Sequence, residues 1–145
     1  MAVISSHVLD SVKGISAAGI RVEFFQLSED RSSQRLFETH SDSEGRISES
    51  VALEDNPADT MYELVFHTGD YFPVAVIAQG SHHNMQSVVV RISLPDPDAR
   101  YHIPVVLSPH SYTIWWSGYT DLIVDEFTGT GGFPAQPSYP LYGSH

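Results

Sequence analysis

The alternation of apolar and polar side chains is the pattern that most limits how this chain can fold. Apolar residues recur at every second position in four clear rows, which are Ile20 to Phe24, Tyr62 to Phe66, Val88 to Leu94 and Tyr101 to Leu107. A period of two residues places these side chains on one face of an extended strand. The pattern therefore predicts β-strands that each turn one face to a core.

Weaker strand patterns and turn residues complete this picture. The weaker strands are Val3 to Leu9, Gln34 to His40, Arg46 to Val51 and Ser111 to Trp116, and clusters of Gly, Pro, Asp, Asn and Ser separate the strands. One helix is predicted over Tyr71 to Gln79, with Asp70 as its cap, Pro73 in its first turn and Gly80 just past its end. About eight short strands and one short helix indicate an all-β fold, a two-sheet β-sandwich with Greek-key connections.

The composition limits the class of protein and of partner. The chain has 145 residues, of which 41% are hydrophobic, enough for one domain with a buried core. No apolar run is long enough to span a membrane, and the N-terminus lacks the pattern of a secretory signal. The 18 acidic and 7 basic residues give a net charge of −11, which argues against nucleic acid and anionic membranes as partners. Because the chain has no Cys, disulfides, thiolate metal sites and cysteine nucleophiles are excluded.

The composition changes near the C-terminus. From Ser117 to His145 the chain is rich in Gly, Pro and aromatic residues and carries little charge. We predict a sandwich domain over residues 1–116 and an extension over residues 117–145. The extension is either loosely ordered or packed onto the domain or a neighbouring subunit, since aromatic side chains gain little in a free tail.

Two histidines and an arginine are candidates for one site. His7 lies in an apparent strand near the N-terminus, Arg46 begins a strand after an acidic turn, and His102 lies in the row from Tyr101 to Leu107. If the odd-numbered residues of that row face the core, His102 faces the other side, and Pro104 indicates a sheet edge or an outward face because it donates no ladder bond. A His exchanges a proton near neutral pH, and an Arg holds an oxyanion. Since such residues are more often ordinary surface residues, the pattern alone leaves both interpretations open.

The motifs around these residues resemble a known family. Residues 6–10 (SHVLD), the Gly-Arg turn at 45–46, residues 66–72 (FHTGDYF) and residues 101–112 (YHIPVVLSPHSY) together are similar to the 5-hydroxyisourate hydrolases, the enzymatic relatives of transthyretin. The similarity runs over roughly residues 5 to 114, with the motifs in the same order. The resemblance implies a transthyretin-like sandwich that assembles as a homotetramer, a dimer of dimers, with active sites in a cleft at a subunit interface.

The resemblance also implies a reaction without a cofactor or a metal ion. Water would open the cyclic ureide ring of 5-hydroxyisourate, a small heterocyclic substrate. His7 and His102 would position and deprotonate this water or carry its proton, and Arg46 would bind the substrate and stabilise negative charge on a carbonyl oxygen. The family's peroxisomal targeting tripeptide is not present at the end of this sequence, which favours a cytoplasmic location.

The motif that ends the sandwich departs from the family. Hydrolases of this branch end in Tyr-Arg-Gly-Ser, which helps to line the site, whereas this chain has Trp115, Trp116, Ser117 and Gly118. We expect Trp115, Trp116, Ser117 and the nearby Tyr112 to bind the substrate, with Ser117 able to replace the terminal Ser after a shift of one residue. A Trp wall favours flat apolar partners over polar purine derivatives.

Three functions therefore stay open. The first is hydrolysis of 5-hydroxyisourate, favoured by the three central residues. The second is hydrolysis, cyclisation, rearrangement or decarboxylation of another small heterocycle in a biosynthetic pathway, favoured by the Trp wall and the aromatic extension. The third is a small-ligand binding module without activity, in which both histidines and the arginine would have no role. The pair His82 and His83 does not predict a metal site, because adjacent residues point apart and no carboxylate lies beside them.

Overall fold

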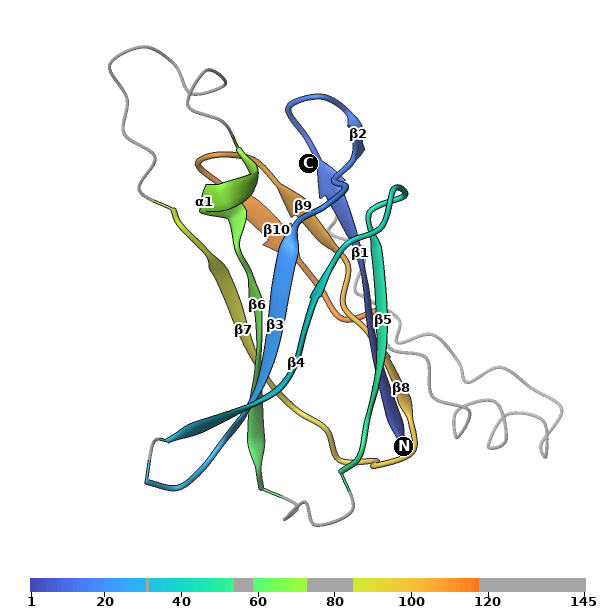
Figure 1. Cartoon of the computed structure of the whole chain (residues 1–145), viewed down its shortest axis with the longest axis vertical. Helices are drawn as coiled ribbons and strands as arrows, with labels where there is room; N and C mark the ends of the chain where they lie inside the picture. Colours follow the sequence, from blue (N-terminus) through green and yellow to red (C-terminus); the bar gives the residue numbers. More distant parts are fainter. Residues whose placement is uncertain (31, 54–58, 73–84, 118–145) are drawn as a thin grey trace, which may run out of the picture.

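The alternating segments fold into two facing β-sheets (Figure 1). The computed structural model describes residues 1–30, 32–53, 59–72 and 85–117. These residues form ten strands and one helix, which are β1 (Ala2–Asp10), β2 (Ile15–Ser16), β3 (Arg21–Leu27), β4 (Ser33–His40), β5 (Arg46–Val51), β6 (Met61–Phe66), α1 (Thr68–Tyr71), β7 (Val88–Ser93), β8 (Arg100–His102), β9 (Val105–Leu107) and β10 (Tyr112–Ile114). The prediction of an all-β sandwich with one short helix is confirmed.

One of the two sheets is built around β1. This strand pairs antiparallel with β2 and β5 and parallel with β8 and β9, and β10 follows β9. The other sheet has the order β4, β3, β6, β7, with antiparallel neighbours throughout. The core lies between the sheets, and its largest fully buried side chains include Tyr62, Phe24, Phe66 and Ile4. Burial of each such side chain contributes about 1.5–3 kcal/mol to folding.

Alternation along β1 sets the direction of the candidate site residues. Ile4, Ser6 and Val8 are buried between the sheets, whereas Ser5 and His7 are half-buried on the outer face. The apolar residues at even positions hold the strand against the core. As a result, the polar residues at odd positions are presented on the outside of the sandwich.

The helix differs from its prediction. The α1 helix covers only Thr68–Tyr71, and Asp70 lies inside it rather than at its N-terminal cap. Phe72 already has an extended conformation, with φ −82° and ψ 114°. Phe72 precedes Pro73, and a proline ring disfavours the helical region for the residue before it. The predicted helix start is therefore wrong, and the rest of that helix, residues 73–79, lies outside the described residues.

The apolar row from Tyr101 to Leu107 is one stretch interrupted at Pro104. The β8 strand ends at His102 and β9 begins at Val105, so the residue without an N–H falls where no ladder bond is needed. Both pieces pair with β1, and β10 pairs with the other side of β9. Of the two alternatives for Pro104, the sheet edge is therefore wrong, because Pro104 is buried between paired strands; by register Pro104 shares the face of His102. This interruption and the short β2 explain why the strands outnumber the prediction.

Within the described part of the chain, no helix is long and apolar enough to cross a membrane. The predicted extension, residues 117–145, lies outside the described residues except for Ser117. His82 and His83 also lie outside them.

Candidate active site

His7, Arg46 and His102 come together on the outer face of the sheet around β1. Arg46 is the first residue of β5 and lies directly opposite His7 in the antiparallel pair. His102 ends β8 and lies opposite Ser5, which shares the outer face of β1 with His7. Neighbouring strands are about 4.8 Å apart, and residues two positions apart on one strand are separated by about 7 Å. The three residues that the sequence singled out therefore form one polar patch.

A tight turn fixes Arg46 at the start of β5. The Oδ1 atom of Asp42 accepts hydrogen bonds from the backbone N–H groups of Arg46 and Glu44, each at 2.9 Å. These hydrogen bonds, together with the nearby positive charge of Arg46, lower the pKa of the Asp42 carboxyl. Gly45 has φ +76°, and a Cβ there would lie 2.5 Å from a backbone oxygen of β1. The turn can approach β1 this closely only because Gly has no side chain.

The same turn holds the ring of His7. The Nε2 atom of His7 lies 3.0 Å from the carbonyl oxygen of Glu44 and 3.3 Å from Oγ of Ser16. A carbonyl oxygen only accepts hydrogen bonds, so Nε2 carries the proton in this contact. In a neutral His7 ring, Nδ1 is therefore the basic nitrogen.

His102 is half-buried and contacts β1 through its side chain. Its Nδ1 atom lies 2.8 Å from Oγ of Ser5. Burial lowers the pKa of His102 from its ordinary 6.5, and the charges of Arg46 and His7 lower it further. Both causes disfavour the imidazolium form. At neutral pH His102 is therefore uncharged and able to accept a proton.

The residues after β10 continue beside β8 and alternate between two faces. The N–H of Ser117 donates to the carbonyl of His102 at 2.9 Å, and the N–H of Trp115 donates to the carbonyl of Pro104 at 3.3 Å. Residues opposite one another across a strand pair share a face. This register places Ser117 on the face of His102 and Trp116 on the core-facing side.

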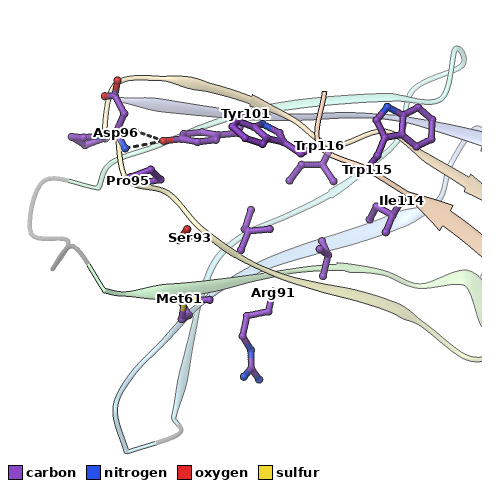
Figure 2. Close-up of a pocket in the computed structure, with 13 residues that line it drawn as sticks. Met61, Arg91, Ser93, Pro95, Asp96, Tyr101, Ile114, Trp115 and Trp116 are labelled. Carbon is purple, nitrogen blue, oxygen red and sulfur yellow. Dashed lines mark hydrogen bonds between the residues drawn. The ribbon is translucent and has the colours of Figure 1, made fainter. Parts of the chain in front are cut away.

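A groove opens on the core-facing side of the same strands (Figure 2). It has a volume of about 920 Å³ and is lined mainly by apolar side chains from both sheets and by the two tryptophans, among them Met61, Ile92, Tyr101, Ile103, Ile114, Trp115 and Trp116. Tyr101 and Ile103 flank His102 in the sequence and point to the opposite face. The groove and the His7–Arg46–His102 patch therefore lie on opposite sides of one sheet.

Tyr112 lies apart from the patch. It is opposite Leu107, at the end of β9 that is distant from His102. The side chain of Leu107 is fully buried in the core, whereas that of Tyr112 is 44% exposed at the sheet edge. Contact between Tyr112 and a substrate stays a prediction, as does contact with Trp116.

Two polar groups of the patch were not predicted. Ser5 could have been found, because alternation puts it on the same face as His7. Its contact with His102 depends on the pairing of distant strands, which no local pattern encodes. The second group, the carbonyl of Glu44, belongs to the backbone and has no signature in the sequence. Among the described residues, no three His, Asp or Glu side chains cluster in the way that a metal ion requires.

Comparison with known proteins gives the family of the chain. The model of the HIUase/Transthyretin family matches residues 4–116. The chain belongs to this family. It is 34% identical to 5-hydroxyisourate hydrolase 2 of Rhizobium meliloti (strain 1021) over 113 residues, which cover 77% of this chain and 92% of the relative. It is 30% identical to the 5-hydroxyisourate hydrolase of Halalkalibacterium halodurans over 112 residues, which cover 77% of this chain and 94% of the relative. These relatives of the HIUase/Transthyretin family are hydrolases, and this chain is an enzyme of the same branch.

Solved structures of the HIUase/Transthyretin fold resemble the chain at lower identity. Transthyretin from Sparus aurata has a TM-score of 0.65 and 24% identity, covering 81% of this chain and 97% of that one. An (S)-allantoin synthase has a TM-score of 0.63 and 24% identity, covering 81% of this chain and 44% of that one. At this identity, the similarity establishes the shared sandwich.

Proposed function

We propose that this chain hydrolyses 5-hydroxyisourate by attack of water on a carbonyl of the cyclic ureide ring. The observation that carries the proposal is the patch in which a neutral His102 and a second histidine, His7, lie near the guanidinium of Arg46. A base and a fixed cation are the two groups that such a hydrolysis needs. The names of the related hydrolases support the substrate.

The proposed reaction adds one water across one ring C–N bond. Nε2 of His102 takes a proton from water as the water oxygen attacks the carbonyl carbon. Arg46 stabilises the negative charge that develops on the carbonyl oxygen. When the C–N bond breaks, the leaving nitrogen receives a proton from the imidazolium of His102 or by way of His7. The mechanism uses no cofactor and no metal ion.

We also propose that a homotetramer, a dimer of dimers, completes the site. The patch lies on an outer sheet face where Arg46 is exposed and His7 and His102 are half-buried. A second subunit across this face would exclude water and strengthen the electrostatic interactions of the patch. Ser117 shares this face by register and would form part of one wall of the cleft. The cytoplasm stays the expected location.

A spectrophotometric assay with 5-hydroxyisourate, freshly made from urate by urate oxidase, tests the proposed activity. We expect the unmodified chain to accelerate the decay of the substrate absorbance and His102→Asn to abolish this acceleration while it keeps its circular dichroism spectrum and assembly. His40→Asn is the matched control, because His40 is exposed on β4 of the other sheet. Retained activity in His102→Asn would refute the role of His102. No acceleration by the unmodified chain would refute the substrate.

Another small heterocycle is the second candidate substrate, and one observation favours it. The positions of the family's Tyr-Arg-Gly-Ser hold Trp115, Trp116, Ser117 and Gly118, so a positively charged wall has become aromatic. Such a wall binds flat apolar rings better than polar ones. Because these are the chain's two Trp residues, a ligand at this wall should quench the intrinsic fluorescence. Quenching by a larger heterocycle, without turnover of 5-hydroxyisourate, would support this candidate.

A further inference from the structure

Ser5 makes a short contact with His102 that the reaction above leaves without a role. Its Oγ atom lies 2.8 Å from Nδ1 of His102 and 3.5 Å from the carbonyl oxygen of Tyr101. Ser5 and His102 are opposite one another in the parallel pair of β1 and β8, and β5 pairs with the other side of β1. The contact is therefore set by two adjacent strands of one sheet rather than by a loop.

The single proton of the Ser5 hydroxyl decides which nitrogen of His102 is basic. If the hydroxyl donates to Nδ1, a neutral ring carries its proton on Nε2, and Nε2 cannot take a proton from water. If the hydroxyl instead points to the carbonyl of Tyr101, its oxygen accepts the Nδ1–H bond, and Nε2 keeps a lone pair. Only the second arrangement provides a base at Nε2.

The position of the hydroxyl makes Nε2 the nitrogen available for the reaction. Nδ1 of His102 is covered by Ser5 in both arrangements, so water can reach the ring nitrogen only at Nε2. The low pKa of His102, caused by burial and by the charges of Arg46 and His7, keeps the ring neutral near neutral pH. A neutral ring exists as two tautomers. A neighbour that accepts a hydrogen bond from Nδ1–H raises the fraction of the tautomer whose lone pair is on Nε2.

His7 has the opposite arrangement. The carbonyl of Glu44 holds the proton on Nε2 of His7, so the basic nitrogen of that ring is Nδ1. A backbone carbonyl thus holds the ring of His7, and a side-chain hydroxyl holds the ring of His102. A substitution of Ser5 can alter His102 without altering His7, which makes the effect separable.

We propose that Ser5 is a positioning residue that holds His102 with its proton on Nδ1 and its lone pair on Nε2. The catalytic meaning of this inference rests on the proposed hydrolase function, but the tautomer is a property of the resting protein. Ser5 acts through His102 and need not touch the substrate. Its loss should therefore lower kcat and leave KM nearly unchanged.

Nitrogen-15 NMR of the full chain, labelled at histidine, tests the tautomer without substrate. We expect His102 to be protonated on Nδ1 in the unmodified chain and in Ser5→Thr, which keeps the hydroxyl. In Ser5→Ala, the proton should move toward Nε2 of His102, whereas the signals of His7 should not change. A His102 protonated mainly on Nε2 in the unmodified chain, or a tautomer that Ser5→Ala leaves unchanged, would overturn the inference.

Steady-state kinetics provide the second arm of the test. Since general base catalysis contributes at least about a hundredfold, we expect Ser5→Ala to lower kcat about tenfold and to change KM by less than about twofold. Ser5→Thr should keep most of kcat. Ser50 is an exposed serine on the same face of β5 as Arg46, and Ser50→Ala should change neither kcat nor KM. An unchanged kcat in a folded Ser5→Ala would overturn the inference. If the unmodified chain does not turn over 5-hydroxyisourate, the proposed function fails, and the NMR result alone decides the role of Ser5.

Discussion

Arg46 influences His102 from across an intervening strand. The β1 strand lies between β5, which carries Arg46, and β8, which carries His102. Even so, the charge of Arg46 is the largest cause, after burial, of the lowered pKa of His102. We expect Arg46→Gln to raise this pKa in an NMR titration and Arg46→Lys, which keeps the charge, to leave it nearly unchanged. An unchanged pKa in Arg46→Gln would contradict electrostatic coupling within the patch.

The same lowered pKa predicts how the enzyme responds to acid. Because the base is the neutral form of His102, kcat/KM should fall only as the pH drops below the ordinary histidine value of 6.5, through the lowered pKa of the folded protein. Stability changes in the same direction. The unfolded state binds this proton more readily, so the free energy of unfolding decreases as the pH falls from 6.5 toward the folded pKa. If kcat/KM instead began to fall at a pH above 6.5, the assignment of His102 as the base would be contradicted.

Half-buried Tyr71 and fully buried Tyr62 should respond differently to loss of their hydroxyl groups. Tyr71 donates to Oδ2 of the buried Asp10 at 2.7 Å, and burial together with this carboxylate raises the pKa of Tyr71 to about 12. Tyr71→Phe should therefore lower the free energy of unfolding by about 2 kcal/mol. The hydroxyl of Tyr62 is buried without a hydrogen-bond partner among the described residues, so Tyr62→Phe should leave stability unchanged or raise it. Urea unfolding at neutral pH measures both, and equal losses would contradict this difference.

At the scale of elements, the turn before β5 should be the least tolerant connection near the site. Gly14 and Gly45 both have positive φ, so an alanine at either position costs about 1–2 kcal/mol. A Cβ at Gly14 meets no atom within 4 Å, whereas a Cβ at Gly45 would lie 2.5 Å from the carbonyl oxygen of Val8. Gly45→Ala should therefore lose more stability than Gly14→Ala and also lose turnover, because the turn carries Arg46 and the carbonyl that holds His7. Urea unfolding and the 5-hydroxyisourate assay test both variants, and equal behaviour would contradict the steric argument.

Elements with a strong two-residue period could be predicted from the sequence. The row from Tyr101 to Leu107 forms strands as expected, with Tyr101, Ile103, Val105 and Leu107 buried, and Arg46 begins its strand as expected. The helix start was wrong because a capping pattern at Asp70 was given more weight than the effect of Pro73 on the residue before it. The edge expected at Pro104 was wrong because a residue without an N–H can also lie at a break between two strands, where no ladder hydrogen bond is needed.

The sequence could single out the residues of the candidate site, but not their contacts. His7, Arg46 and His102 belong to separate motifs that resemble one family, and strand facing put His102 on the side of its strand away from the core. The bond from Ser5 to His102 depends on the register of strands that are distant in the sequence. Likewise, the side of the sheet on which Trp115 and Trp116 lie depends on hydrogen bonds to Pro104 and His102, which no local pattern contains.

At the scale of the whole molecule, net charge should control assembly. Each chain carries −11, so the four subunits of the proposed homotetramer repel one another. Raising the ionic strength to about 0.15 M shortens the screening length to about 8 Å and weakens this repulsion. We expect the tetramer fraction in sedimentation velocity to rise with added salt. A tetramer fraction that falls with salt would indicate that attraction between opposite charges dominates the interfaces.

The parallel pairing of β1 with β8 and β9 also has a consequence for folding of the chain during its synthesis. The first strand of the chain finds these partners only near the end of the sandwich, and the contact between Ser5 and His102 joins residues 97 positions apart. Such distant pairings are slow to form. As the chain leaves the ribosome, β1 emerges before β8 and cannot form this pairing until β8 has been synthesised. A nascent chain that ends before β8 cannot carry the proposed activity, because β8 brings His102 into the sheet.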